Sequence, residues 1–185
     1  MHATSTPSPL PQRGLPPVLG TRLRVLVLGT FPGERSLEEG QYYAHPRNRM
    51  WPALAPVIGV PAGAPYRTRL LRLRQAGLGL WDVLAACERR GSLDQNIRAV
   101  TAVPNDLGSV VAAHPGLRAV CLNGGSAARL FDRFQLPRAL WTATGLRIVT
   151  LPSTSPAHAR MSDAAVHDAW RTALTSLLAR VDDSA

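Results

Sequence analysis

The sequence predicts an α/β domain in which a central parallel sheet is covered by helices on both faces. Three short aliphatic runs, at 24–29, 118–124 and 146–152, have the nearly continuous apolar pattern of strands buried on both faces, and a weaker fourth run spans 79–84. Segments with apolar residues at helical spacing lie between these runs. Such alternation of strands and helices is typical of a parallel sheet flanked by helices.

The helical segments are expected at 49–58, 66–75, 126–134 and 162–180. Ser162 is the predicted N-cap of the last segment, because a serine hydroxyl can accept a hydrogen bond from a free N–H group of the first helical turn. Apolar residues recur at helical spacing along that segment, which predicts that one of its faces packs against the core.

A length of 185 residues and a mass of 19.9 kDa fit one domain with a single core. Five prolines and small polar residues in 1–20 predict a flexible N-terminal segment, which leaves 21–185 as the folded domain. The prolines also interrupt the order of a secretory signal, and no apolar run reaches the roughly 18 residues that span a bilayer. We therefore expect a cytoplasmic monomer that makes no membrane contact.

The basic residues are 21 arginines and no lysine, and the formal net charge is +9. A sequence pI near 11.3 favours a polyanionic partner, nucleic acid first, whereas a cationic surface without a dedicated ligand is the alternative. The two cysteines are too few for a four-cysteine iron–sulfur cluster, a disulfide scaffold or the usual cysteine-based zinc sites. No two histidines have helical metal-binding spacing, so we expect no metal and no cofactor.

Ligands of open parallel sheets bind outside the carboxyl ends of the strands, so functional residues are expected directly after the predicted strands. The first strand leads into Gly29-Thr30-Phe31-Pro32-Gly33, whose glycines permit a tight turn with backbone N–H groups facing a cleft. An ordinary strand-to-helix turn is the alternative. The turn lacks the lysine of a P-loop and the third glycine of a dinucleotide-binding fingerprint.

The segment 38–51 has the densest mixture of aromatic and polar side chains in the chain. It contains Tyr42, Tyr43, His45 and Asn48, and its glycine and proline favour a loop over a helix. Such a loop can form a pocket that stacks on and hydrogen-bonds a planar ligand. A surface loop whose aromatic residues cover the edge of the core is the alternative.

Two further segments could bind phosphate groups. The glycine pair in 123–126 opens a helix, and a helix N-terminus attracts anions, although close packing at a helix start is an equal alternative. The segment 152–161 holds small hydroxyl residues braced by two prolines, which can offer hydroxyl and N–H groups to phosphates. A plain connection before the last helix is the alternative for this segment.

Together these segments resemble the uracil-DNA glycosylase superfamily, and within it most closely the hypoxanthine-DNA (deoxyinosine) glycosylase family. The resemblance runs from about Leu23 to the final helix and depends on the order of its anchor segments, which are 27–33, 38–51, 81–84, 91–94 with 104–106, 123–128 and 151–157. It implies a compact α/β fold with a central four-stranded parallel sheet. It also implies a monofunctional hydrolase that excises hypoxanthine, uracil or both from damaged DNA without a metal.

Two positions depart from the superfamily pattern and keep other functions open. Phe31 stands where many members carry an asparagine or aspartate that handles the attacking water, and Leu151 or Pro152 stands where a histidine often begins the second motif. These departures favour, as an alternative, a nucleic-acid-binding module of the same fold that has lost catalysis. A small α/β enzyme acting on free nucleotides is a third hypothesis.

The resemblance assigns the catalytic amide to Asn48, which is expected to orient water and to hydrogen-bond the departing base. The residues expected to hold the base are Gly29, Thr30, Phe31, Pro32, Tyr42, Tyr43, Asp82 and Asn123. The residues expected to contact DNA are Gly124, Ser153, Thr154, Ser155, His158 and Arg160.

Overall fold

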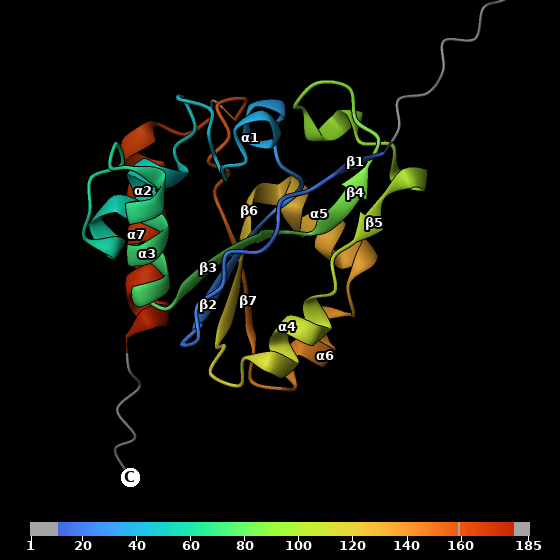
Figure 1. The fold of residues 1–185 in the computed structure, drawn as a ribbon. Helices are drawn as coiled ribbons and strands as arrows, with labels where there is room; N and C mark the ends of the chain where they lie inside the picture. The colour runs from blue at the N-terminus through green and yellow to red at the C-terminus, as the bar shows by residue number, and fades with distance from the viewer. Residues whose placement is uncertain (1–10, 159, 180–185) are drawn as a thin grey trace, which may run out of the picture.

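A parallel sheet lies between two layers of helices in the computed structural model, which describes residues 11–158 and 160–179 (Figure 1). Its strands are β2 (Val25–Gly29), β3 (Leu78–Asp82), β6 (Ala119–Asn123) and β7 (Arg147–Leu151). They lie in the order β3-β2-β6-β7, and every neighbouring pair is parallel. The predicted α/β class and its four-stranded parallel sheet are confirmed.

Helices cover both faces of the sheet (Figure 1). One layer consists of α2 (Met50–Ile58), α3 (Tyr66–Gln75) and α7 (Asp163–Leu178), and the other of α4 (Leu107–Ala113), α5 (Gly124–Phe134) and α6 (Arg138–Thr142). A short helix, α1 (Glu34–Glu39), follows β2 at the carboxyl end of the strands.

Strand β2 shows why the aliphatic run in the sequence is nearly continuous. Val25 and Val27 pack into the core cluster beneath α2, α3 and α7, whereas Leu26 and Leu28 pack into the cluster beneath α4, α5 and α6. Because successive side chains of a strand point to opposite faces, a strand covered on both sides needs an apolar residue at every position.

The helices begin and end close to their predicted bounds. Helix α3 has the predicted bounds, and α5 begins at Gly124, two residues before the prediction. The Ser162 hydroxyl accepts a hydrogen bond from the backbone N–H of Ala165 at 3.2 Å, which confirms the predicted N-cap of α7. Helix α7 ends at Leu178, and residue 180, the predicted end, lies outside the described residues.

A second, smaller sheet was not predicted. It is antiparallel, with the order β1-β4-β5, and consists of β1 (Gln12–Arg13), β4 (Leu84–Cys87) and β5 (Val103–Pro104). Two single-turn 3₁₀ helices, at Asp94–Asn96 and Ala99–Thr101, lie between β4 and β5. Strands of two to four residues are too short to leave a periodic pattern, so their pairing cannot be found from the sequence.

The second half of the predicted flexible N-terminal segment belongs to the fold, which corrects the prediction for residues 11–20. Strand β1 pairs with β4, and Val18, which is buried, forms a bridge with Leu80 on the edge of the main sheet. The Tyr42 hydroxyl lies 3.2 Å from the carbonyl oxygens of both Leu15 and Pro16. The first half of that segment, residues 1–10, lies outside the described residues.

The parallel arrangement brings the carboxyl ends of all four central strands to one edge of the sheet, at the top of Figure 1. Helix α1, the segment that leads into α2 and the segment between β7 and α7 gather at this edge. Within residues 11–158 and 160–179, no helix is long and apolar enough to cross a membrane.

Candidate active site

A cleft of about 990 Å³ opens at the carboxyl edge of the sheet. Six segments far apart in the sequence supply its lining: the turn after β2 together with α1, the loop before α2, the end of β3, residues 92–95, the end of β6 together with α5, and the loop after β7. The lining includes most of the residues predicted to form the site, namely Gly29, Thr30, Phe31, Pro32, Tyr42, Tyr43, Asn48, Asp82, Asn123, Ser153, Ser155 and His158.

Asn48 lines this cleft beside the first turn of α2, with its side chain partly exposed. Its Oδ1 accepts a hydrogen bond from the backbone N–H of Met50 at 2.9 Å. This bond satisfies one of the N–H groups that a helix start leaves without an intrahelical partner, and it fixes the plane of the carboxamide. The Nδ2 group of Asn48 has no hydrogen-bond partner among the described residues, so it is available to a ligand in the cleft.

Arg49, the next residue, is buried and joins two loops of the site. Its guanidinium donates hydrogen bonds to the carbonyl oxygens of Ser153, Ser155, His158 and Met161, at 3.0, 3.1, 2.8 and 3.0 Å. All four carbonyls belong to the segment between β7 and α7. The arginine therefore holds that segment against the loop that carries the catalytic candidate, although the sequence did not distinguish it from the other arginines.

Asn123, at the carboxyl end of β6, binds the same segment from the other side. Its Oδ1 accepts from the backbone N–H of Thr154 at 2.9 Å, and its Nδ2 donates to the Thr154 hydroxyl at 3.0 Å. Thr154 is fully buried, so it cannot reach a DNA phosphate, and the prediction that it contacts DNA is wrong. Its role is to anchor the loop, which leaves Ser153 and Ser155 on either side lining the cleft.

Gly124 also has a structural role in place of the predicted phosphate contact. It is buried with φ +91°, and a Cβ there would lie 2.7 Å from the Cβ of Ser153, so no larger residue fits. Gly125 and Ser126, the next two residues of α5, line the cleft instead. The glycine pair thus provides both of the functions that the sequence left as alternatives: close packing at Gly124 and an open helix start at Gly125.

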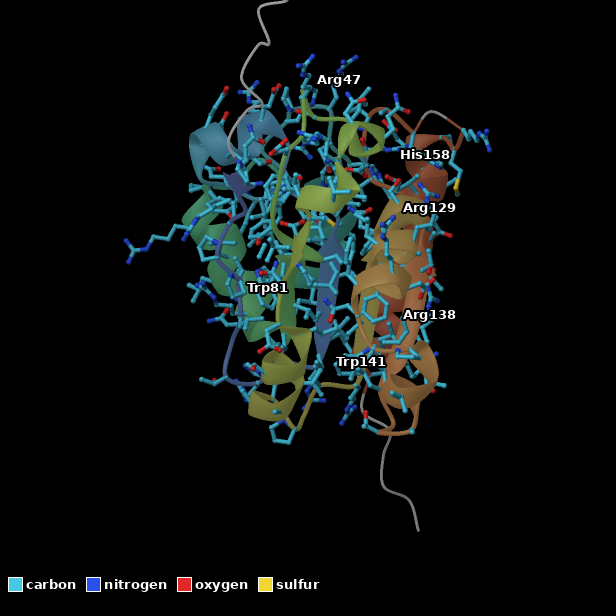
Figure 2. All side chains as sticks on the ribbon, turned by 90° about the vertical axis from the view of Figure 1, so that its right-hand side faces the viewer. Arg47, Trp81, Arg129, Arg138, Trp141 and His158 are labelled. Carbon is cyan, nitrogen blue, oxygen red and sulfur yellow. The ribbon has the colours of Figure 1, made fainter. Side chains whose placement is uncertain are left out.

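Arg160, another predicted DNA contact, is exposed but does not line the cleft. His158 and Arg129 both line it, and Figure 2 shows them on the same side of the molecule, above Arg138 and Trp141. Arg129 was not predicted, since a single arginine on the outer turn of a helix has no distinctive sequence pattern. It adds a positive charge to the rim of the cleft.

Asp82 lies deep in the cleft at the carboxyl end of β3 and is only 4% exposed. Gly29 of β2 pairs with Asp82 in the sheet. A Cβ on Gly29 would collide with the Asp82 carboxyl Oδ1, so the glycine provides space for this side chain. The Oδ2 atom is buried without a hydrogen-bond partner. Burial, together with the nearby carboxyl of Asp94, raises the pKa of Asp82 to about 8, while the Arg89 guanidinium acts in the opposite direction.

Asp94 and Arg89 complete this polar group, and neither was predicted. The Thr30 hydroxyl donates a hydrogen bond to Asp94 Oδ1 at 2.6 Å, and burial raises the pKa of Asp94. Arg89 is buried and donates to the backbone carbonyls of Phe31 and Pro32. Both residues come from the loop between β4 and β5, so they reach the site through the small sheet that the sequence did not reveal.

Phe31 is part of the wall of the cleft and is only 5% exposed. The Arg89 guanidinium lies over its ring, 5.0 Å from the ring centroid. One face of the ring is therefore covered by a cation, and the phenyl group closes the cleft next to the core. A base in the cleft can contact only the small part of the ring that stays exposed.

The two tyrosines at 42 and 43 differ in their surroundings. Tyr42 is buried; its hydroxyl contacts the N-terminal segment, and its carbonyl accepts a hydrogen bond from Trp51 Nε1 at 2.9 Å. Tyr43 has φ +56°, and no other non-glycine residue in the described parts of the chain has a positive φ. Strained backbone of this kind concentrates at functional sites, which favours Tyr43 as the aromatic contact of a ligand. Burial raises the pKa of both phenols, so both stay neutral.

Within the described residues, no group of three or more histidine, cysteine, aspartate or glutamate side chains could hold a metal ion. Cys87 and Cys121 are both buried and unpaired. The groups that line the cleft are instead amides, carboxyls, hydroxyls, imidazoles, backbone N–H groups and arginines. This set can bind a planar polar ring and surround it with hydrogen-bond donors, and it can attract an anionic chain to the rim.

Comparison with known proteins identifies the family. The sequence model described as "Uracil DNA glycosylase superfamily" matches residues 16–174. The chain belongs to the uracil DNA glycosylase superfamily. Two relatives are named hypoxanthine DNA glycosylase. The one from Methanosarcina acetivorans is 33% identical over 152 residues, covering 82% of this chain and 90% of the relative. The one from Methanosarcina barkeri is 35% identical over 114 residues, covering 61% and 71%.

A solved structure has the same fold. It is the solution NMR structure of a protein from Methanosarcina acetivorans that is described provisionally as a uracil DNA glycosylase. The TM-score is 0.71 at 30% identity, and the match covers 90% of this chain and 99% of the other. The resemblance inferred from the ordered sequence segments is confirmed, and the superfamily fold accounts for the position of the cleft at the carboxyl edge of the sheet.

Replacing Arg49 tests whether it holds the loop after β7 in place. In Arg49→Met the carbonyls of Ser153, Ser155, His158 and Met161 lose their donor, and we expect the free energy of unfolding to fall by at least about 3 kcal/mol. Urea denaturation measures the loss. Arg47→Met is the matched control, because the Arg47 side chain is exposed and its loss should change stability little. Equal stability of the two variants would contradict this role.

The buried Asp82 carboxyl should make stability depend on pH. Its pKa in the folded protein, about 8, lies above the value near 4 of an unfolded chain, so between these pH values the folded protein binds more protons than the unfolded one. The free energy of unfolding should therefore fall as pH rises from 5 to 8. In Asp82→Asn this contribution is absent, and the variant should become increasingly more stable than the wild type over that range. The prediction would be contradicted if urea denaturation gave a difference in free energy of unfolding between wild type and Asp82→Asn that stayed constant from pH 5 to 8.

Proposed function

We propose that this protein is a DNA glycosylase that removes deaminated bases, namely hypoxanthine, uracil or both, by hydrolysing the N-glycosidic bond. The observation that carries the proposal is the convergence of Asn48, Tyr43 and Asp82 on one cleft at the carboxyl edge of the sheet, in a chain of the uracil DNA glycosylase superfamily. The names of the two relatives support hypoxanthine as a substrate. Base excision of this kind is the first step in the repair of deaminated DNA.

An enzyme that cuts this bond must take the target nucleotide out of the base stack or meet it in a single strand. The net charge of +9 supplies attraction to phosphates that does not depend on sequence. At the rim, Ser153, Ser155 and His158 from one loop face Gly125 and Arg129 from α5. We assign the phosphates beside the extruded nucleotide to this rim, because hydroxyls, a helix start and an arginine all bind phosphate oxygens.

In the proposed reaction Asn48 acts on the bond that breaks. Its Oδ1 keeps one lone pair free beside the bond to Met50, so it can accept a hydrogen bond from the attacking water, and its Nδ2 can donate to the departing base. An amide cannot take a proton from water. Such a proton transfer is not required before the bond breaks, because the transition state of the reaction resembles an oxocarbenium ion. The phosphates of the DNA stabilise the positive charge on the sugar.

Duplexes and single strands that contain one deoxyinosine or one deoxyuridine test the proposed function. The protein should convert at least one of them to an abasic site, which alkali cleaves into a shorter strand on a denaturing gel. Activity should survive EDTA, and gel filtration should show a monomer, since the proposal includes a cytoplasmic monomer that acts without a metal. Salt-sensitive DNA binding with no base release would overturn the proposal and favour a binding module of the same fold.

Asn48→Ala should lower the single-turnover rate of base release at least tenfold, about 1.4 kcal/mol, while DNA binding is largely kept. The alanine variant also loses the bond to the Met50 N–H, so its melting temperature must be compared with that of the wild type. Asn48→Asp provides a sharper comparison, because it keeps an acceptor for that N–H and removes the two Nδ2 donors. Unchanged chemistry in both variants would assign the reaction to another residue.

A further inference from the structure

Asp82 is the one buried acid that lines the cleft, among the described residues, without a hydrogen bond to its Oδ2 atom. Buried polar atoms are almost always hydrogen-bonded, so an orphaned carboxyl oxygen in a ligand cleft indicates a partner that arrives with the ligand. Asp94, the neighbouring acid, differs in this respect, because it accepts a hydrogen bond from the Thr30 hydroxyl. The turn glycine at 29 provides the space for Asp82, which indicates that the fold accommodates this side chain specifically.

The charged and titratable groups around Asp82 come from every element packed against it. They are Cys87 from β4, Arg89 from the loop after β4, Asp94 from the first 3₁₀ helix, and Tyr42 and Tyr43 from the loop before α2. Arg89 is the single cation among them, and its guanidinium is occupied by the carbonyls of Phe31, Pro32 and Gly91. No cation is therefore dedicated to the Asp82 carboxylate, and burial beside a second acid favours its protonated form.

We propose that Asp82 is a general acid that donates its carboxyl proton to N7 of a purine base as the base departs. The proposal rests on the proposed function and narrows it to a substrate class, namely purines with an unsubstituted N7, of which hypoxanthine is a deaminated example. A buried neutral carboxyl is a suitable proton donor, because it is already protonated at neutral pH. Its contact with the base is weak in the ground state and becomes strong in the transition state, when negative charge develops on the base.

The step balances as follows in atoms and electrons. The bond between C1′ and N9 breaks, and its electron pair goes to the purine, while the Asp82 proton moves to N7, so hypoxanthine leaves as a neutral molecule. Water adds through its oxygen to C1′ and loses one proton. That proton returns to the Asp82 carboxylate, directly or through solvent, which restores the acid. Uracil offers no unprotonated ring nitrogen for the same transfer, so its release gains less from Asp82.

The experiment compares wild type and Asp82→Asn on two duplexes, one with deoxyinosine and one with 7-deaza-2′-deoxyinosine, in which a C–H group replaces N7. Single-turnover rates with excess enzyme report base release without product release. Asp82→Asn nearly preserves shape and still offers hydrogen bonds, but it cannot transfer a proton. Asp132→Asn, an exposed substitution on α5 at a residue that does not line the cleft, serves as the control and should match the wild type.

We expect Asp82→Asn to slow release of hypoxanthine about a hundredfold and release of 7-deazahypoxanthine less than threefold. At subsaturating DNA, the wild-type rate on deoxyinosine should fall more steeply than the rate of Asp82→Asn as pH rises through about 8. Ionisation of the base in the substrate affects both enzymes equally, so the difference between the two pH–rate profiles measures the contribution of the Asp82 carboxyl. This pH comparison decides the question if 7-deaza release is too slow to measure.

The acid role alone would be overturned by an equal loss on both substrates, by wild-type activity in Asp82→Asn, or by identical pH profiles. Wild-type excision confined to uracil would overturn it as well. A wild-type protein that releases no base from any strand would instead overturn the proposed function, and this inference with it.

Discussion

The geometry of the site depends on the buried guanidinium of Arg49. A charged group removed from water must be hydrogen-bonded, and here the acceptors are four backbone carbonyls between β7 and α7 and, at 3.5 Å, the carboxylate of Asp163. Those carbonyls would otherwise need water inside the protein. The same hydrogen bonds therefore satisfy both the buried guanidinium and the buried carbonyls. They also determine where Ser153 and Ser155 lie relative to Asn48, the residue next to Arg49. Asn123 completes the arrangement by holding Thr154 from β6.

The deeper part of the cleft is organised differently, because it keeps a polar atom without a partner. Asp82 Oδ2 is buried and unbonded, and the pKa of its carboxyl is raised, so the ionised form destabilises the folded protein. If stability alone determined this position, an apolar residue or a fully hydrogen-bonded polar residue would be expected there. Retention of a destabilising carboxyl against Gly29 is the kind of local conflict that concentrates at functional sites.

Much of the fold could be predicted because it follows from local patterns. Strands buried on both faces leave continuous aliphatic runs such as 25–28, and Ser162 starts α7 through a contact three residues away. The position of the cleft followed from the rule for open parallel sheets, and Asn48 from the resemblance. Residues 11–20 were misjudged, because their prolines indicate flexibility, whereas Val18 is ordered by Leu80, more than sixty residues further along the chain.

The residues that the sequence could not identify are those whose role depends on distant contacts. Arg49 bonds carbonyls more than a hundred residues away, and nothing in its neighbours separates it from twenty other arginines. Arg89 reaches Phe31 only because the short strands after β3 bring it there. The same contact explains how the superfamily position at Phe31 can lack a polar side chain. With a cation over the ring, the polar groups on this side of the cleft come from β3, which carries Asp82, and from the loop between β4 and β5, which carries Asp94, whereas the turn after β2 supplies part of its wall.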